Sequence, residues 1–174
     1  LHRDPEGTLW LATLGGLNKF DPKTETFTRY TFDQSNQTSI GSNDVSALQI
    51  HQDGQFWVGT YGGGLHLMDI EKGTFKRFTF NAADSTTLSG DIITALLEDG
   101  PDFWVGTWDT KGLNRMDRQT KQCKRYLQGY NIVSVIKDRR GGLWVGTQNY
   151  IFKFNKAADT FEMVEFGGIP ITFN

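Results

Sequence analysis

The chain has 174 residues, enough for one domain with a hydrophobic core, and its 18 basic and 20 acidic residues leave a net charge of −2. Without a concentrated basic segment, nucleic-acid binding is not expected, and no apolar run is long enough for direct membrane insertion. One cysteine excludes an internal disulfide, while 13% aromatic residues and 20 glycines favour packed β-structure with many tight turns.

A tryptophan-bearing strand is predicted four times along the chain. The four tryptophans are Trp10, Trp57, Trp104 and Trp144, and successive ones lie 47, 47 and 40 residues apart. Each follows an acid and a turn, the acids being Asp4, Asp53, Asp99 and Asp138. Because these acids recur in every unit, we expect them to accept backbone N–H bonds in turns. A period near 40 with several short β-segments is typical of the blades of a β-propeller.

Each unit is predicted to form four antiparallel strands, and the second unit shows them most clearly. Its strands are expected at 44–52, 55–61, 64–70 and 74–80, separated by glycine-containing turns. Glycines in the Trp strand, Gly59, Gly106 and Gly146, are expected to leave room for a bulky neighbour. The fourth segment alternates apolar and charged residues, which predicts an outermost strand with one edge in solvent. No segment has the apolar spacing of a helix.

These units predict an all-β fold, an incomplete β-propeller of about four blades within residues 1–174. The blades are expected at about 1–32, lacking its inner strand, then at 43–80, 91–128 and 131–166, with 167–174 leading into a further blade. We therefore expect a fragment of a longer propeller. Unpaired blade edges favour aggregation, so we expect the rest of the parent propeller or a second copy to cover them.

Binding residues are expected on the end of each blade where the second strand turns into the third. The long loops 33–43 and 81–90 begin at this end, and loops on a rigid scaffold commonly carry binding residues. The candidate ligand-binding residues are Tyr61, Trp108, Asp109 and Tyr150. Aromatic rings can cover the C–H faces of sugars, and a carboxylate can accept hydroxyl hydrogen bonds. The alternative is that these aromatics pack between blades. The insertion 108–111 is the first choice for a functional loop.

Other reactive residue types have simpler structural interpretations. The glycines at 62–64 are expected to form a β-turn, because no helix with Lys and Ser or Thr follows to complete a phosphate loop. The histidines His2, His51 and His66 are scattered, so no metal site is predicted, and His66 is expected on a strand surface. Cys123 is interpreted as a small buried substitute for Phe, with a reactive thiol as the alternative. No catalytic residue and no cofactor are predicted.

Two segments carry a resemblance to a known family. The segments "EDGPDFWVGTWDTKGLNRMDRQTKQCKRY" (98–126) and "DPEGTLWLATLGGLNKFDPKTETFTRY" (4–30) resemble two-component regulator propeller repeats. The resemblance extends over nearly the whole chain in four correlated copies. The fourth unit departs from the pattern, with "NYIFKFN" where Gly-Leu is expected, and so does Cys123 in a Phe position.

The resemblance implies a place in the extracytoplasmic sensor region of hybrid two-component histidine kinases. It therefore implies a periplasmic location and non-enzymatic sensing of oligosaccharides in carbohydrate utilisation. The alternative is a structural propeller segment that contacts partner chains or neighbouring modules and has no small ligand. A propeller enzyme acting on glycans is a third class, but it would need a unique carboxylate pair in one cleft, and none can be nominated.

Overall fold

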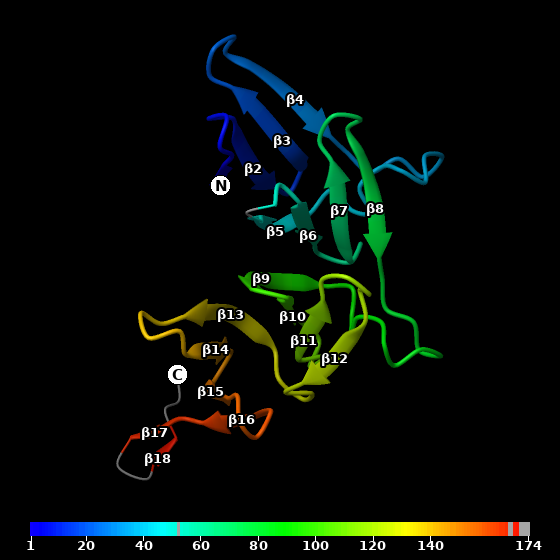
Figure 1. The fold of residues 1–174 in the computed structure, drawn as a ribbon. Helices are drawn as coiled ribbons and strands as arrows, with labels where there is room; N and C mark the ends of the chain where they lie inside the picture. Colours follow the sequence, from blue (N-terminus) through cyan, green and yellow to red (C-terminus); the bar gives the residue numbers. More distant parts are fainter. Residues whose placement is uncertain (52, 167–168, 171–174) are drawn as a thin grey trace. The chain divides into compact units, whose positions relative to one another are not determined.

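The computed structural model describes residues 1–51, 53–166 and 169–170, and the chain divides into two compact units. The first unit is Leu1–Phe80 with Asp91–Ile93, and the second is Asn81–Gly90 with Thr94–Asn174. The described residues form four four-stranded antiparallel sheets, each with its strands in chain order, and contain no helix (Figure 1). The prediction of an all-β fold built from propeller blades is confirmed.

The first unit contains two blades. The first blade has β1 (His2–Arg3), β2 (Leu9–Thr13), β3 (Gly16–Asp21) and β4 (Thr26–Tyr30). The second blade has β5 (Val45–Ile50), β6 (Phe56–Thr60), β7 (Leu65–Asp69) and β8 (Thr74–Phe78). The inner strand of the first blade is thus represented by two residues, which pair with β2.

The two blades of the first unit pack face to face through large apolar side chains. Trp10 on β2 lies edge-on to Phe56 on β6, with ring centroids 4.8 Å apart, and it stacks on the ring of Tyr30 at 6.1 Å. Val58 and Met68 of the second blade are buried in the same cluster. Strands sandwiched in this way are apolar on both faces, and β6 is accordingly buried at every position.

The second unit contains the third and fourth blades. The third has β9 (Ile93–Asp99), β10 (Asp102–Thr107), β11 (Leu113–Asp117) and β12 (Cys123–Tyr126). The fourth has β13 (Ile132–Lys137), β14 (Leu143–Thr147), β15 (Ile151–Asn155) and β16 (Thr160–Met163). A short hairpin of β17 (Glu165–Phe166) and β18 (Ile169–Pro170) follows. Most of the segment 167–174, expected to lead into another blade, lies outside the described residues.

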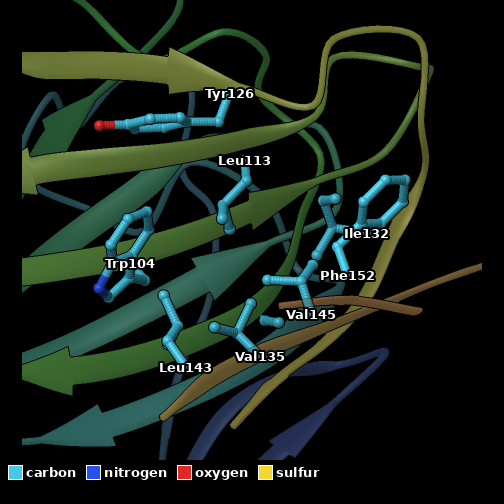
Figure 2. Packing of buried hydrophobic residues seen from close by; sticks show 9 residues of the cluster. Trp104, Leu113, Tyr126, Ile132, Val135, Leu143, Val145 and Phe152 are labelled. Atoms are coloured by element: carbon cyan, nitrogen blue, oxygen red, sulfur yellow. The ribbon is translucent and has the colours of Figure 1, made fainter. Parts of the chain in front are cut away.

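Side chains from both blades of the second unit form its core (Figure 2). Trp104 and Leu113 of the third blade lie in one cluster with Ile132 and Val145 of the fourth. Gly106 makes this approach possible, because a Cβ atom there would lie 2.6 Å from Ile132 Cγ2. The predicted role of the strand glycines is therefore confirmed at Gly106.

Gly59 in the first unit likewise leaves room for a bulky neighbour, as predicted, whereas the neighbour of Gly146 is a small hydroxyl group. A Cβ atom at Gly59 would lie 2.6 Å from Ile93 Cγ2. At Gly146 the nearest atom is the Ser134 hydroxyl oxygen, also at 2.6 Å, which is a small group that can rotate away.

An acid before the Trp strand accepts a hydrogen bond from the indole in three blades. These bonds join Trp10 Nε1 to Asp4 Oδ2 at 2.9 Å, Trp104 Nε1 to Asp99 Oδ2 at 3.4 Å, and Trp144 Nε1 to Asp138 Oδ2 at 2.7 Å. In the second blade the residue six positions before Trp57 is His51, whose ring centroid lies 6.2 Å from the indole. Asp53 accepts a turn bond from Gln55 N. Backbone N–H bonds confirm the turn role at Asp4, Asp53 and Asp138, but the indole bond was not predicted.

The long inter-blade loops follow a course that the sequence analysis did not predict. Loop 33–43 leaves the end of β4 and extends beside β8 of the next blade, where Thr38 O accepts a bond from Phe75 N at 2.8 Å (Figure 1). Loop 81–90 does the same at β12, where Thr86 O accepts a bond from Cys123 N at 2.7 Å. The expectation of a solvent-exposed outer edge is therefore wrong for part of β8 and β12.

Candidate ligand-binding face

The turn between the second and third strands and the end of the fourth strand lie at the same end of each blade. In the first blade Thr13 pairs with Gly16 and Leu17 pairs with Tyr30, which brings both to one end. In the second blade the corresponding turn is the glycine run 62–64. Gly64 has φ +81°, and a Cβ atom there would lie 2.5 Å from Phe78 O, so only glycine fits. The run reverses the chain between β6 and β7, as expected, and the amides of Gly62 and Gly64 both donate to Asp91 O.

The turn at 108–112 is the most unusual on this end of the second unit. Asp109 and Thr110 have φ +55° and +58°, in the left-handed region that non-glycine residues rarely adopt. The connection to the fourth blade braces them, because Thr110 N donates to Asn131 Oδ1 at 2.7 Å and Gly129 N donates to Thr110 O at 2.8 Å. Strained backbone held in this way is concentrated at functional sites in proteins.

Trp108 and Asp109 lie together in this turn, as the sequence predicts. The Trp108 side chain is half-buried and that of Asp109 is exposed. An indole face with a carboxylate beside it offers an apolar surface and a hydrogen-bond acceptor to one ligand. The turn is therefore preorganised, and its two functional groups are accessible.

Tyr150 lies at the same end of the fourth blade, but its ring packs within the protein. Its centroid is 5.9 Å from that of Tyr130 in a perpendicular arrangement and 6.5 Å from that of Phe152. The packing alternative considered for the candidate aromatics therefore describes this residue. Its ring contributes to the apolar cluster of the second unit.

Tyr61 belongs to the first unit and is the most exposed of the candidate aromatics, with 45% of its surface accessible. Its backbone is fixed by a bond from Tyr61 N to Asp44 O at 2.8 Å and by a β-bridge to Ile92. The candidates are thus distributed over both units. Of the four, Trp108 and Asp109 form one local group.

Two titratable residues, His66 and Cys123, are buried within the sheets. His66 is fully buried on β7, so the expected strand-surface role is wrong. Its Nε2 accepts a bond from Gly41 N at 2.8 Å and its Nδ1 donates to Val58 O at 3.2 Å, which requires the neutral ring. Burial lowers the pKa of His66 to about 4. Cys123 is buried, as expected, and burial raises the pKa of its thiol to about 12.

A depression of about 280 Å³ lies at the opposite end of the second unit and includes none of the candidate ligand-binding residues. Four of its charged groups form two pairs. Lys137 Nζ lies 2.5 Å from Asp99 Oδ1, and Arg115 Nε lies 3.9 Å from Asp102 Oδ1. Burial raises the pKa of Asp102, opposed by the nearby Arg115 charge. The Lys137–Asp99 pair joins the third and fourth blades, whereas Arg115 and Asp102 lie on neighbouring strands of the third blade.

Sequence reasoning did not identify the residues that brace the candidate turn. Asn131 binds Thr110 through its side chain, and Tyr130 O accepts a bond from Gly112 N at 3.1 Å. The sequence did contain a signal for Asn131, because an Asn or Asp residue lies just before the inner strand in three of the blades. The other two, Asn43 and Asp91, each accept a bond from the chain leaving the preceding outer strand.

The fold and the repeated turns define this chain as a set of propeller blades. Residues 39–62 and 126–149 match the family described as two component regulator propeller, so the chain contains repeats of this family. The segment 39–62 begins in the loop before β5 and ends just after β6, the Trp strand of the second blade. The segment 126–149 begins at the last residue of β12 and ends just after β14, the Trp strand of the fourth blade. No curated protein matches the chain.

Solved structures with the same fold include extracellular domains of signalling proteins. One is the extracellular domain of the proposed hybrid two-component system BT3049 from B. thetaiotaomicron, with 26% identity and a TM-score of 0.77. The match covers 89% of this chain and 21% of that one. The extracellular domain of BT4673 from the same organism has 23% identity and a TM-score of 0.77, over 97% of this chain and 24% of that one.

The fold also occurs in an enzyme. Virginiamycin B lyase from Staphylococcus aureus has 15% identity and a TM-score of 0.70, over 96% of this chain and 55% of that one. At this identity the likeness shows the fold alone. The chain spans less than a quarter of the two signalling domains, with 21% and 24% covered, and resembles part of a larger propeller that makes contacts with further blades.

Proposed function

We propose that this chain is part of the extracytoplasmic sensor propeller of a hybrid two-component regulator and lies in the periplasm. In this role it binds a ligand and does not convert the ligand chemically. The observation that carries the proposal is the combination of the family's repeats at 39–62 and 126–149 with the likeness to the extracellular domain of BT3049. Packed blades suit this role, because each unit holds its exposed turns on a β-sheet scaffold while its other surfaces can contact neighbouring modules.

The ligand class that fits best is an oligosaccharide in a carbohydrate-utilisation system. The turn at 108–112 supports it, since Trp108 offers an indole face and Asp109 an exposed carboxylate on a braced backbone. Tyr61 is a further exposed aromatic for the same ligand class on the first unit. Tyr150 contributes by packing behind the turn and not by direct contact, given its ring contacts with Tyr130.

Isothermal titration against a panel of plant and host oligosaccharides tests this function. The titration uses both this chain and the intact receptor, because a ligand held by several blades would need the whole propeller. Trp108→Ala is expected to weaken binding about tenfold, the loss that about 1.4 kcal/mol of stacking represents. Arg140→Ala is the control, since Arg140 is exposed in the turn between β13 and β14, at the other end of the fourth blade from the β14–β15 turn.

The second candidate function is a structural propeller segment that contacts partner modules and has no small ligand. The packing of Tyr150 favours this second function, because the ring of this candidate binding residue packs against Tyr130 and Phe152 within the protein. The absence of heat with every sugar on the intact receptor would support this candidate. Turnover of a sugar by the purified protein would overturn both candidates.

A further inference from the structure

Two inter-blade loops of this chain each insert one aliphatic side chain against the next blade. Loop 33–43 buries Ile40 completely, and Ile40 lies in the cluster that contains Val58 and Phe75 of the second blade. Loop 81–90 buries Leu88, which is 1% exposed. The inserted residues follow Ser39 and Thr87, so both loops present a hydroxyl residue and then an aliphatic one.

An arginine on the outermost strand binds each loop. Arg77 donates to Ser39 O at 2.8 Å from Nη2 and 3.0 Å from Nε. Arg125 donates to Thr87 O at 3.0 Å from Nη2 and 3.2 Å from Nε. A guanidinium that makes two bonds to one carbonyl fixes both the position and the direction of the loop backbone.

A second polar group on the neighbouring strand binds the amide that follows the aliphatic residue. Gly41 N donates to His66 Nε2 at 2.8 Å, and Ser89 N donates to Asn114 Oδ1 at 2.8 Å. His66 and Asn114 are the cross-strand partners of Arg77 and Arg125. Each loop is therefore bound by the same three features, an arginine, a polar partner opposite it and an apolar surface for Ile or Leu.

The first blade presents the same three features without a loop. Asn18 on β3 pairs with Arg29 on β4, in the register that His66 and Arg77 occupy in the second blade. With Leu11 and Phe27 they line a depression of about 690 Å³. Phe27 is 65% exposed, whereas Phe75 at the matching position is 4% exposed beneath its loop.

The polar groups of this depression are paired with each other. Arg29 Nε donates to Asn18 Oδ1 at 3.1 Å. In the third blade the matching oxygen, Asn114 Oδ1, accepts the loop amide of Ser89 instead. The Asn18 amide nitrogen is held by Thr13 Oγ1 at 3.0 Å, so its oxygen is oriented toward the depression and the arginine.

We propose that this face of the first blade is a binding site for an extended peptide in which a Ser or Thr precedes an Ile or Leu, supplied by the inter-blade loop of an adjoining propeller blade. The aliphatic side chain would lie between Leu11 and Phe27. The carbonyl of the hydroxyl residue would accept from Arg29, and the amide after the aliphatic residue would donate to Asn18 Oδ1. The proposal does not depend on the oligosaccharide hypothesis.

The test uses the chain's own loop as a peptide added in trans. A synthetic peptide of residues 84–92 (DSTTLSGDI) is titrated into the isotopically labelled 174-residue chain, and backbone and side-chain NMR shifts are followed. Saturable shifts centred on Leu11, Asn18 and Arg29 are expected. A single loop segment binds weakly, so the titration extends to roughly 5 mM peptide.

Matched variants separate this site from non-specific binding. A peptide with Leu88→Asp is expected to bind at least tenfold more weakly, because the aliphatic anchor is lost. Arg29→Ala in the chain is expected to weaken binding about tenfold, whereas Arg140→Ala, in an exposed turn, is expected to leave it unchanged. The peptide variant keeps the test valid even if an altered chain folds poorly.

Three results would overturn the proposal. The first is no shift in the first blade at the highest peptide concentration, and the second is equal binding of the Leu88→Asp peptide. The third is a stable dimer in light scattering that Phe27→Asp dissociates, because a second copy would then be the occupant of this face.

Discussion

The tight packing of one blade against the next makes a specific prediction about Gly106. A Cβ atom at this position would lie 2.6 Å from Ile132 Cγ2, 3.1 Å from Ile132 Cβ and 3.2 Å from Ala95 Cβ. Ile132 is fully buried, so it has little room to move. Gly106→Ala is therefore expected to lower the free energy of unfolding by about 1–3 kcal/mol, the usual cost of forcing extra volume into a packed core.

Gly146 provides the matched control in the next blade of the same unit. The nearest atom to a Cβ there is the hydroxyl oxygen of the exposed Ser134, which can rotate away. Replacing a strand glycine by alanine otherwise gains about 0.5–1 kcal/mol through reduced chain entropy. Gly146→Ala is therefore expected to be neutral or slightly stabilising, opposite in sign to Gly106→Ala.

Urea unfolding followed by tryptophan fluorescence measures both variants under the same conditions. The double variant Gly106→Ala with Ile132→Ala is expected to lose less stability than the sum of the single changes, since the first methyl group fills space that the second change opens. Equal stability of Gly106→Ala and the unaltered chain would refute the reasoning, and so would a similar loss at Gly146.

Three further predictions concern the bond between Asp138 and the Trp144 indole, the Cys123 thiol, and the bonds from Arg125 to loop 81–90. Hydrogen bonds from Trp144 and from backbone amides lower the pKa of Asp138 in the folded chain. The ionised carboxylate therefore stabilises the fold fully above the unfolded pKa near 3.9, and this stabilisation is lost as pH falls through the lower folded pKa. Asp138→Asn should therefore destabilise at neutral pH and differ little near pH 2 in urea titrations, and a constant difference would contradict this. The Cys123 thiol, with its pKa raised to about 12, should resist alkylation at pH 8 until the chain unfolds, and rapid reaction of the native chain would contradict the structure. Arg125→Ala should cost about 1.5–3 kcal/mol and expose loop 81–90 to proteolysis, because the guanidinium donates to several loop carbonyls; an unchanged cleavage pattern would show that the loop is held in another way.

Controls for these measurements lie in exposed turns of the same chain. Arg140→Ala removes a guanidinium whose residue is exposed and should leave both unfolding and proteolysis of loop 81–90 unchanged. Glu71→Gln changes an exposed side chain in the turn between β7 and β8 and should change the free energy of unfolding by less than about 0.5 kcal/mol.

The predicted strands agree closely with the structure because their signals are local. Strand 55–61 is observed as Phe56–Thr60 and strand 64–70 as Leu65–Asp69, since apolar residues on both faces and glycine turns at either end specify them without distant contacts. The candidate site was only partly predictable. Trp108 and Asp109 are neighbours in one turn, whereas the packing of Tyr150 depends on Tyr130, which lies in another connection.

The course of the inter-blade loops could not be read from local patterns. Loop 33–43 is polar and rich in Ser, Asn and Thr, which predicts an exposed loop, and its short-range bonds such as Ser35 N to Asp33 Oδ1 fit that reading. Its position is fixed by Arg77, which bonds Ser39 at a separation of 38 residues. His66 was misplaced for the same reason, since its bond to Gly41 spans 25 residues.

The sequence by itself determined that this protein is a series of four-stranded blades, because the tryptophan strand, its preceding acid and its glycine turns recur with their spacing intact. Only the tertiary structure decided which aromatic rings face inward, which acids bind an indole and which loops cover an outer strand. Those outcomes depend on side chains brought together from different strands and blades. The alternation of residues within one strand specifies its two faces, but not the neighbour that each face meets.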